Sequence, residues 1–522
     1  MEESKKIFGI DLGTTYSCIA HLNKNGEPEV IPNSEGDLIT PSVIYFETLQ
    51  NVVVGKVAKM SADQDPKRVV DFVKRNIGDE TFSYEIDGKT FRAEELSAII
   101  LKKLVQDAST YLNEPVTDVV ITCPAYFGIR ERMATENAGK IAGLTVHGVV
   151  NEPTAAAICY GIDKLDKSQT VLVYDLGGGT FDITMIDVNK DAISTITTGG
   201  DHQLGGKDWD DRIIGYFATS FMEKYGEGND PRLDPQSMQD LRNKAEEAKK
   251  ILTTKETYKT VVSFNQQQEK IELTRKKFEE LTKDLLNRTI ELSKLLLEGA
   301  KKTGHPHVDT FLMVGGSSRM PMVRAAIVSD LQMDPIIFEP DMAVAKGAAI
   351  IGYYKKQLLT GSTGTIGPDS KSLEFPPINS KAFGVVLTRK GSSGQDENYV
   401  YFIIPKHTRL PAEKTEKGFG TYATNQRSVK IELMEQADGN FEPSEKLQDN
   451  TSIGIGTIEG LPPNLPANTS IEITFQIKDD GTLALHASCL NKECHFNTKI
   501  SGVMNENELK GAITEHMGLK IS

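Results

Sequence analysis

Two Asp-Leu-Gly motifs, 164 residues apart, have the clearest chemical potential in this sequence. IDLGTTYS contains Asp11 and YDLGGGTFD contains Asp175, and each motif joins an apolar run to a second, alternating run. Each pattern predicts a hairpin whose glycines let backbone N–H groups approach an anion closely. Two such hairpins facing each other would hold a polyphosphate from both sides, and their carboxylates would hold a hydrated Mg²⁺.

Two further glycine-rich turns fit the same kind of site. FLMVGGSSRMP (311–321) follows a predicted strand and suits the sugar or α-phosphate side of a nucleotide. The segment 198–211 adds two Gly-Gly pairs before a predicted helix. These turns extend the predicted phosphate site toward a whole nucleotide.

One polar helix face is open to two interpretations. In NKAEEAKKILT (243–253) four polar residues recur at i, i+3, i+4 and i+7, opposite a face of alanine and leucine; they are Glu246, Lys249, Lys250 and Thr253. From spacing alone, a solvated polar stripe is favoured over a binding surface.

The elements that must position these residues change character along the chain. Up to about residue 355 short strands alternate with helices such as 91–112, which predicts α/β architecture. The stretch 356–380 is rich in Gly, Ser and Pro toward its end and predicts a flexible linker. Short alternating segments over 381–503 predict a β-sandwich, including a hairpin that turns near Asp480. Residues 504–522 predict one short helix that then stops.

Composition restricts the function classes. The chain has 522 residues, so we expect more than one domain, and its net charge of −14 argues against nucleic acid as a partner. The five cysteines are few and scattered, which favours a reducing compartment. The sequence has no long apolar run and its start lacks an apolar leader core, so we expect no membrane association and a cytoplasmic location.

Several long motifs in consistent order resemble the seventy-kilodalton heat-shock chaperones, the DnaK family. In the first part they are IDLGTTYS (10–17), VKRNIG (73–78), ITCPAYF (121–127), VVNEPTAAA (149–157), YDLGGGTFD (174–182), LMVGGSSRMP (312–321) and EPDMAVAKGAA (339–349). In the β module they are IIPKHTRLP (403–411), YATNQRSVKIELME (422–435) and 458–481. The resemblance implies a two-lobed ATPase domain of the actin and sugar-kinase fold, followed by an all-β sandwich that binds extended hydrophobic peptides of unfolded or nascent polypeptides.

The resemblance also implies roles for single residues. Lys74 would position the attacking water and offset charge on the γ-phosphoryl group, with Asp11, Glu152, Asp175 and Thr180 as the other catalytic residues. Asp11, Glu152 and Asp175 would order water around Mg²⁺, and Asp182 would help to bind K⁺. ATP or ADP would be held by Gly13, Thr14, Thr15, Tyr16, Gly177, Gly178, Gly179, Thr180, Gly205, Gly206, Glu246, Lys249, Lys250, Thr253, Gly315, Gly316, Ser317, Arg319 and Asp341. Lys250 stands where many relatives have arginine, so adenine stacking would be weaker.

In the sandwich, the resemblance places five residues along the peptide groove: Phe419, Thr421, Tyr422, Val429 and Ile431. Val429, Ile431 and Leu433 alternate with charged residues and share one face. At Ile431 and Leu433 the sandwich core is an equally good assignment.

The sequence departs from the family pattern at four places. About 20 residues follow the last strand, so the helical lid is expected to be absent, and the leucine-rich interdomain linker is replaced. Gly148 and Ile129 stand where relatives carry charged residues that meet J-domain co-chaperones, whereas Pro124 and Arg132 match. The segment between Ile77 and Phe91 is short. We therefore expect fast peptide exchange, weak coupling and weak J-domain stimulation, with a nucleotide exchange factor as a further candidate partner.

Three function classes follow. The first is an ATP-hydrolysing chaperone, and the second is an ATP-binding adaptor with little turnover. The third, a sugar kinase or an actin-like filament, shares the fold. A kinase needs a sugar-binding carboxylate in the cleft, and neither member of the third class accounts for the β module.

Overall fold

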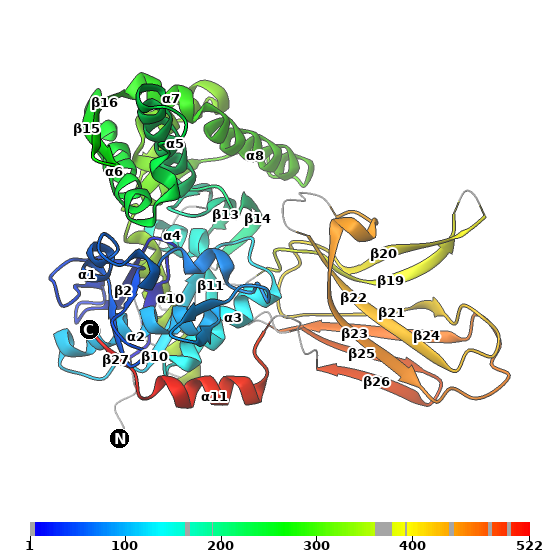
Figure 1. Ribbon diagram of the computed structural model, residues 1–522. Coiled ribbons are helices and arrows are strands. Elements are labelled where there is room, and N and C mark those ends of the chain that lie inside the picture. The colour runs from blue at the N-terminus through cyan, green and yellow to red at the C-terminus, as the bar shows by residue number, and fades with distance from the viewer. Residues whose placement is uncertain are drawn as a thin grey trace.

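The computed structural model describes residues 6–161, 168–189, 192–360, 378–391, 394–437, 443–478, 483–497 and 503–522. It has two α/β lobes with a β-sandwich at their side (Figure 1). This arrangement confirms the predicted two-lobed ATPase fold followed by an all-β module.

The internal repeat extends from the two hairpins to two whole sheets. Lobe I contains strands in the order β11-β10-β1-β2-β3, and lobe II contains β14-β13-β12-β17-β18. In both sheets the first three strands along the chain are antiparallel and two parallel strands follow. The strands of lobe I are β1 (Phe8–Asp11), β2 (Tyr16–Leu22), β3 (Pro28–Ile31), β10 (Asp118–Cys123) and β11 (Thr145–Asn151); those of lobe II are β12 (Gln169–Leu176), β13 (Phe181–Val188), β14 (Ile193–Asp201), β17 (Thr310–Val314) and β18 (Pro335–Ile337).

Smaller elements complete lobe I. A second sheet and a short hairpin lie beside the main sheet, and α2 and α3 pack in the same lobe (Figure 1). Helix α2 buries Leu96, Ile99, Ile100 and Leu104, as its periodicity predicted. The elements are β4 (Thr40–Pro41), β5 (Ile44–Phe46), β6 (Asn51–Val54), α1 (Lys56–Ser61), η1 (Pro66–Arg68), β7 (Val69–Val70), η2 (Val73–Asn76), β8 (Tyr84–Ile86), β9 (Lys89–Phe91), α2 (Ala93–Leu112) and α3 (Ile129–Ile141).

Lobe II carries a helical subdomain above its sheet. Helix α6 begins where Asp234 accepts a hydrogen bond from the Ser237 N–H at 2.8 Å, with Pro235 in the first turn. The elements are α5 (Gly206–Tyr225), η4 (Pro231–Leu233), α6 (Pro235–Thr254), β15 (Thr257–Phe264), β16 (Gln267–Thr274), α7 (Arg275–Leu281), α8 (Lys283–Lys302), η5 (Gly316–Arg319), α9 (Pro321–Ala326) and η6 (Ile327–Leu331).

Two helices, α4 (Glu152–Gly161) and α10 (Ala343–Thr360), cross between the two main sheets. They touch backbone to backbone, because a Cβ on Gly347 would collide with the carbonyl of Ala155. This crossing joins the lobes at the floor of the cleft.

The β module is a sandwich of two four-stranded sheets, β20-β19-β22-β23 and β21-β24-β25-β26. The predicted hairpin is confirmed, since Phe475 pairs with Leu485 and Ile473 with Ala487; its turn at 480–481 lies outside the described residues. The strands are β19 (Phe383–Lys390), β20 (Asp396–Ile404), β21 (Ala412–Gly420), β22 (Ser428–Gln436), β23 (Asn450–Glu459), β24 (Ser470–Ile477), β25 (Leu483–Cys489) and β26 (Lys492–Asn497), with η7 (Leu447–Asp449) before β23.

The predicted linker differs from the structure at both ends. Helix α10 continues to Thr360, beyond the expected boundary at 355. Asn379 and Ser380 are buried, and the Ser380 hydroxyl donates to the carbonyl of Phe127 in lobe I at 2.8 Å. Residues 361–377 lie outside the described part of the chain.

The end of the chain also differs from its prediction. Helix α11 (Glu506–His516) forms as expected, but it is followed by β27 (Lys520–Ile521), which pairs with β6 of lobe I. In Figure 1 α11 runs along lobe I, away from the sandwich.

Candidate nucleotide site

The two Asp-Leu-Gly hairpins face each other across the boundary between the lobes. A Cβ on Gly178 would collide with the side chain of Thr15, and a Cβ on Gly179 would collide with that of Thr14. Only residues without a side chain can approach the opposite hairpin so closely. The structure therefore brings the two repeats together, as the sequence predicted.

Local hydrogen bonds hold each turn. In lobe I the Gly13 N–H donates to the Ser17 hydroxyl at 3.1 Å, and the Ser42 hydroxyl donates to the Gly13 carbonyl at 2.8 Å. In lobe II the Gly177 N–H donates to the Thr180 carbonyl at 3.0 Å. The predicted Gly205 packs on this second turn, since a Cβ there would meet the backbone of Gly179.

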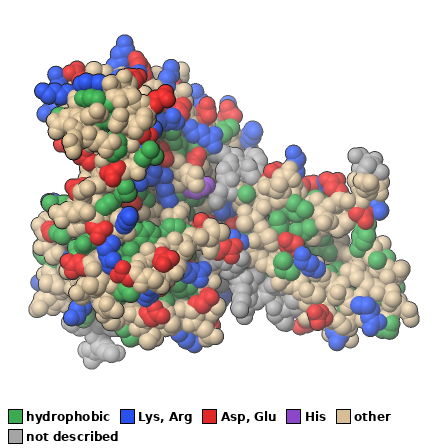
Figure 2. Space-filling model, viewed as in Figure 1, with side chains coloured by type: hydrophobic (Ala, Val, Ile, Leu, Met, Phe, Trp, Pro, Cys, Tyr) green, Lys and Arg blue, Asp and Glu red, His purple; other side chains and the backbone are tan. Residues whose placement is uncertain are grey.

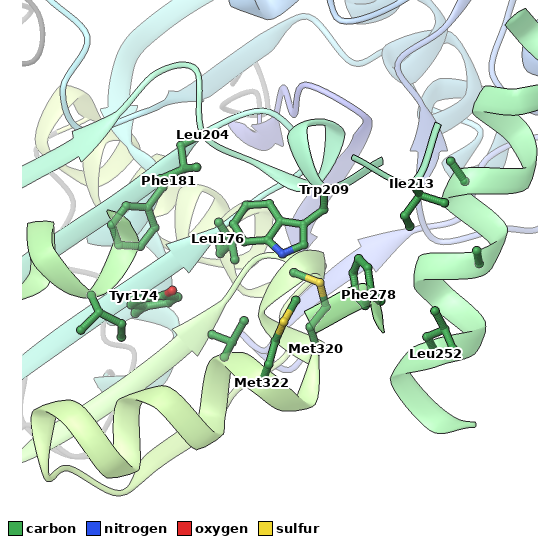
Figure 3. Packing of buried hydrophobic residues seen from close by; sticks show 14 of the residues in the cluster. Tyr174, Leu176, Phe181, Leu204, Trp209, Ile213, Leu252, Phe278, Met320 and Met322 are labelled. Atoms are coloured by element: carbon green, nitrogen blue, oxygen red, sulfur yellow. The ribbon is translucent and has the colours of Figure 1, made fainter. Parts of the chain in front are cut away.

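One hydrophobic cluster inside lobe II holds three of the glycine-rich turns in place. Leu176 and Phe181 flank the second hairpin, Trp209 follows Gly206 on α5, and Met320 follows the turn at 315–317. Figure 3 shows these side chains packed in one group with Tyr174 and Phe278. Packing of large buried side chains of this kind makes the relative positions of the turns rigid.

Acidic residues gather with one lysine at the floor of the cleft. Lys74, in η2, is buried and forms an ion pair with Glu152 at the start of α4. Asp175 and Asp182 are also buried, and Asp182 accepts a hydrogen bond from the Ala125 N–H at 2.9 Å. Asp11 accepts one from the Thr122 hydroxyl at 3.2 Å.

Burial and mutual repulsion disfavour the charged forms of the carboxylates in this group. Burial raises the pKa of Asp11, and the neighbouring charge of Glu152 raises it again. Burial and then Glu152 also raise the pKa values of Asp175 and Asp182. Burial opposes the charge on Lys74, but Glu152 and Asp11 outweigh it and raise the pKa of Lys74. One oxygen of Asp182, Oδ2, is buried without a hydrogen-bond partner.

The third glycine turn lies against the second hairpin. Gly315 has φ = 80°, and a Cβ there would collide with Asp175 Oδ1 and the Leu176 carbonyl. Its N–H donates to the Pro340 carbonyl at 2.9 Å, and Arg319 forms an ion pair with Asp341 beside it. The structure thus places Gly315, Arg319 and Asp341 in the same cavity as the two Asp-Leu-Gly turns.

The polar face of α6 points into the same cleft. Tyr16 of lobe I donates to Glu246 at 3.1 Å, and Lys250 contacts Glu246 at 2.7 Å and the Tyr16 hydroxyl at 3.1 Å. Lys249 is held by Asp210 at 2.6 Å, and the Thr253 hydroxyl bonds back to the Lys249 carbonyl. This face therefore lines the cleft between the lobes, with Lys250 still exposed to solvent.

These features enclose a cavity of about 570 Å³ between the lobes. Of the predicted catalytic, nucleotide-binding and metal-ordering residues, four do not line it: Gly179, Gly205, Gly206 and Asp182. All four lie directly behind the lining. Gly179 belongs to the second turn, and Gly205 and Gly206 contact that turn. Asp182 stands opposite Asp175 in the antiparallel pairing of β12 with β13.

Among the charged residues in or beside the cleft, sequence reasoning missed Lys59, Asp210 and Arg75. Lys59 of α1 forms an ion pair with Glu246, and Asp210 holds Lys249. Arg75 of lobe I donates to the Gly179 carbonyl at 2.9 Å and pairs with Asp208 of lobe II at 2.5 Å. Its position next to Lys74 was an available signal, whereas Lys59 and Asp210 carry none that one sequence shows.

The five predicted groove residues of the sandwich fall into two groups. Thr421, Val429 and Ile431 are buried, and Val429 and Ile431 belong to the sandwich core. Phe419 is partly buried against Tyr401, and Tyr422 is exposed with its hydroxyl bonded to Asp396. Ile431 and Leu433, for which the sandwich core was the alternative, are both buried in this cluster, and Val429 is buried there as well. Of the five predicted groove residues, only Phe419 and Tyr422 present surface.

Blue and red side chains are interspersed over the face of both lobes shown in Figure 2, without a large area of one charge. Within the described ranges no helix is long and apolar enough to cross a membrane. Among the same residues, no three His, Cys, Asp or Glu side chains converge as a direct metal ligand set.

Comparison with known proteins agrees with this geometry. The sequence matches the family described as Hsp70 protein over residues 7–86 and 79–518. It is 37% identical over 98% of its length to the chaperone protein DnaK of Thermotoga petrophila, and equally to that of Thermotoga maritima, and covers 84% of each. The DnaK of Thermotoga neapolitana is 38% identical over the same shares. A chain with these matches, and with two matching Asp-Leu-Gly turns facing each other across one cleft, belongs to the Hsp70 family.

Proposed function

We propose that this protein is an ATP-dependent chaperone that hydrolyses ATP in the interlobe cavity and binds extended hydrophobic segments of unfolded or nascent polypeptides at the sandwich. The observation that carries the ATPase proposal is the contact of the two glycine turns across the lobes, with Lys74 and four carboxylates at its base. Phosphates between these turns would receive N–H groups from both lobes.

The residues present fit a divalent cation. The raised pKa values of Asp11 and Asp175 and the unpartnered Oδ2 of Asp182 all describe excess negative charge in a closed space. Asp11, Glu152 and Asp175 would hold Mg²⁺ through water, because Mg²⁺ dehydrates reluctantly. Mg²⁺ would neutralise phosphate charge, and we propose K⁺ as a second cation beside Asp182.

Lys74 is the residue that we assign to the reacting phosphoryl group. Its ammonium group is buried and can change partner from Glu152 to a phosphate oxygen or to the attacking water. Thr180, at the end of the second turn, lines the cavity and would orient the same water. Catalysis would then rest on positioning and on charge, as is general for phosphoryl transfer.

On the adenosine side, Lys249, Lys250 and Glu246 would contact the nucleoside. The ammonium groups of Lys59 and Lys250 each lie 5.4 Å from the centre of the Tyr16 ring. Gly315, Gly316 and Ser317 would follow the sugar and the α-phosphate.

The peptide proposal rests on the sandwich. Phe419 and Tyr422 would contact an extended peptide, whose main-chain hydrogen bonds would give broad specificity. J-domain co-chaperones and a nucleotide exchange factor are proposed partners of the ATPase lobes. Four free thiols among the described residues suit a reducing compartment, so we propose the cytoplasm.

Turnover of labelled ATP by the purified protein tests the enzymatic proposal. We predict that Lys74→Ala lowers the rate constant at least about 100-fold, because it removes a fixed positive charge from the reacting group. Lys140→Ala, on the exposed side of α3, is the matched control and should leave the rate unchanged. Tight ATP binding without measurable turnover in the parent protein would instead identify an ATP-binding adaptor.

A further inference from the structure

The segment 503–522, which we call the return segment, leaves the sandwich and packs on lobe I (Figure 1). Its helix α11 is capped by Asn505, whose side chain accepts from the N–H groups of Asn507 and Glu508 at 3.0 and 3.1 Å. The cap and the length of eleven residues indicate that the local sequence favours a helix here.

Apolar contacts attach this helix to lobe I. Met504 and Ala512 are buried against Ala98 of α2 and Ile141 of α3, with Leu509 and Ile513 packed around them. Ile521 belongs to the main hydrophobic cluster of lobe I, where Leu519 packs as well. Burial of this kind is the largest favourable contribution to such an attachment.

Main-chain pairing adds a second kind of attachment. Strand β27 runs parallel to β6, with Lys520 opposite Asn51 and Ile521 opposite Val52. The Lys520 N–H donates to the Gln50 carbonyl at 2.9 Å, and the Ser522 N–H donates to the Val52 carbonyl at 3.0 Å. The return segment thus occupies a sheet edge that would otherwise lie open.

Charged groups of β9 and α2 complete the contact. Lys89 pairs with Glu515 at 2.6 Å, and Lys102 donates to the carbonyl of His516 at 2.5 Å. His516 is fully buried with its ring 3.6 Å from Glu95. The exposed pairs add little free energy, but together with the buried His516 they fix one register of the helix.

The attachment limits how far the sandwich can move. Strand β26 ends at Asn497, and Met504 on lobe I is seven residues later, so the connection spans at most ~25 Å. On the other side, Phe383 of β19 is 23 positions after Thr360 of α10, which would allow ~80 Å. The shorter connection, to the return segment, therefore limits how far the sandwich can move away from the lobes.

The sandwich also contacts both lobes directly. Ile129, at the start of α3, is buried in the sandwich core cluster, and its N–H donates to Glu435 at 3.1 Å. Arg130 donates to the Ser452 carbonyl at 2.6 Å. On lobe II the Thr198 N–H donates to the ring of His407 at 3.3 Å.

We propose that the return segment is a structural part of lobe I and a second tether that keeps the sandwich docked on the ATPase lobes whichever nucleotide they hold. A module tied to one body at both of its ends has a high effective concentration at its docking surface, so separation is disfavoured. The proposal does not require ATP turnover, because the tether acts equally in the nucleotide-free protein.

A specific protease site placed between Asn497 and Val503 tests the tether in the full-length protein. Small-angle X-ray scattering of the uncut protein should give one radius of gyration without nucleotide, with ADP and with ATP. After cleavage the return segment should co-elute with lobe I, and the radius of gyration should increase in at least one of these states. An uncut protein that expands with ADP as far as the cut protein, or a cut protein that never expands, would overturn the proposal.

A second variant separates the tether from the stability of lobe I. Ala512→Glu with Ile521→Asp places charges at the two buried contacts and should release the segment, which amide hydrogen exchange at β6 would report as a loss of protection. Thr514→Glu, on the exposed side of α11, is the matched control and should keep both the protection and the compact radius. Unchanged protection at β6 in the double variant would also contradict the proposal.

Discussion

At the scale of residues, the most constrained feature is the acidic group around Lys74. Burial and mutual repulsion raise the pKa values of Asp11, Asp175 and Asp182, yet the cleft supplies one buried ammonium group among the described residues that face them. Buried carboxylates of this kind are stable only when cations or donors compensate them. We therefore expect a nucleotide to bind here together with a cation, whose charge would compensate these carboxylates.

Close approach of the two turns gives a prediction for Gly179. Gly179→Val would place a branched side chain where the Thr14 side chain lies, so the lobes could not close on the phosphates. We predict that ATP affinity falls at least about tenfold, or ~1.4 kcal/mol, measured by isothermal titration calorimetry. Gly215→Val, inside α5 with open space around it, should bind ATP as the parent does. Equal affinities for the two variants would contradict the facing arrangement.

At the scale of elements, sequence and structure agree where a local pattern is strong. The spacing of Leu96, Ile99 and Leu104 was sufficient for α2, and the duplicated Asp-Leu-Gly motif was sufficient for both hairpins and their partnership. The polar face of α6 could not be assigned from spacing, because solvent and a nucleotide cleft favour the same residue types. Only the family resemblance placed this face in a cleft, and the four residues do line the cavity between the lobes.

Contacts between distant elements that share no repeated motif could not be predicted. Ile129 stands where the family pattern has a charged residue, and in the structure it is buried against the sandwich. An apolar side chain at the start of α3 is explained by this docking surface, which no local period reveals. The buried state of Val429 and Ile431 likewise depends on which strand faces the opposite sheet.

The contact between β14 and the sandwich predicts a pH dependence. Burial, together with the charge of Lys406, lowers the pKa of His407 to about 4 from its ordinary 6.5. The separated state would therefore bind more protons than the docked state between these values, so docking is strongest above pH 6.5 and weakens as the pH falls toward 4. Hydrogen exchange at Thr198, followed against pH, checks this expectation.

His407→Gln is the control for that experiment, because glutamine retains a hydrogen-bond acceptor but does not titrate in this range. Protection at Thr198 in this variant should vary less between pH 6.5 and 4 than in the parent. An identical pH profile for both proteins would assign the effect to another group.

At the scale of the whole molecule, the sandwich is attached to the ATPase lobes at both of its ends. The chain leaves the ATPase lobes at Thr360, forms the sandwich, and returns to α2, α3 and β6 through the return segment. The sequence predicted a helix there but not its partner, because eleven residues carry too little pattern to identify a docking surface. Domain boundaries drawn from composition alone therefore misplace this segment.

Permanent docking predicts weak coupling between peptide and nucleotide. An allosteric ligand can shift only an equilibrium between two arrangements, and the second tether restricts one of them. We predict that an extended hydrophobic peptide changes the rate of ATP turnover less than about twofold in the parent, well below the usual 5- to 150-fold range of allosteric coupling. Cleavage between Asn497 and Val503 should increase the effect; a strong effect in the uncut protein would contradict this expectation.

The central claim is that one nucleotide lies between the two Asp-Leu-Gly turns. A crystal structure of Lys74→Ala grown with ATP and Mg²⁺ tests it most directly. We predict β- and γ-phosphates between Thr14 and Gly178, with Mg²⁺ and its waters near Asp11 and Asp175. Nucleotide bound elsewhere, or lobes that hold Asp11 and Asp175 apart with no phosphate between them, would contradict the claim.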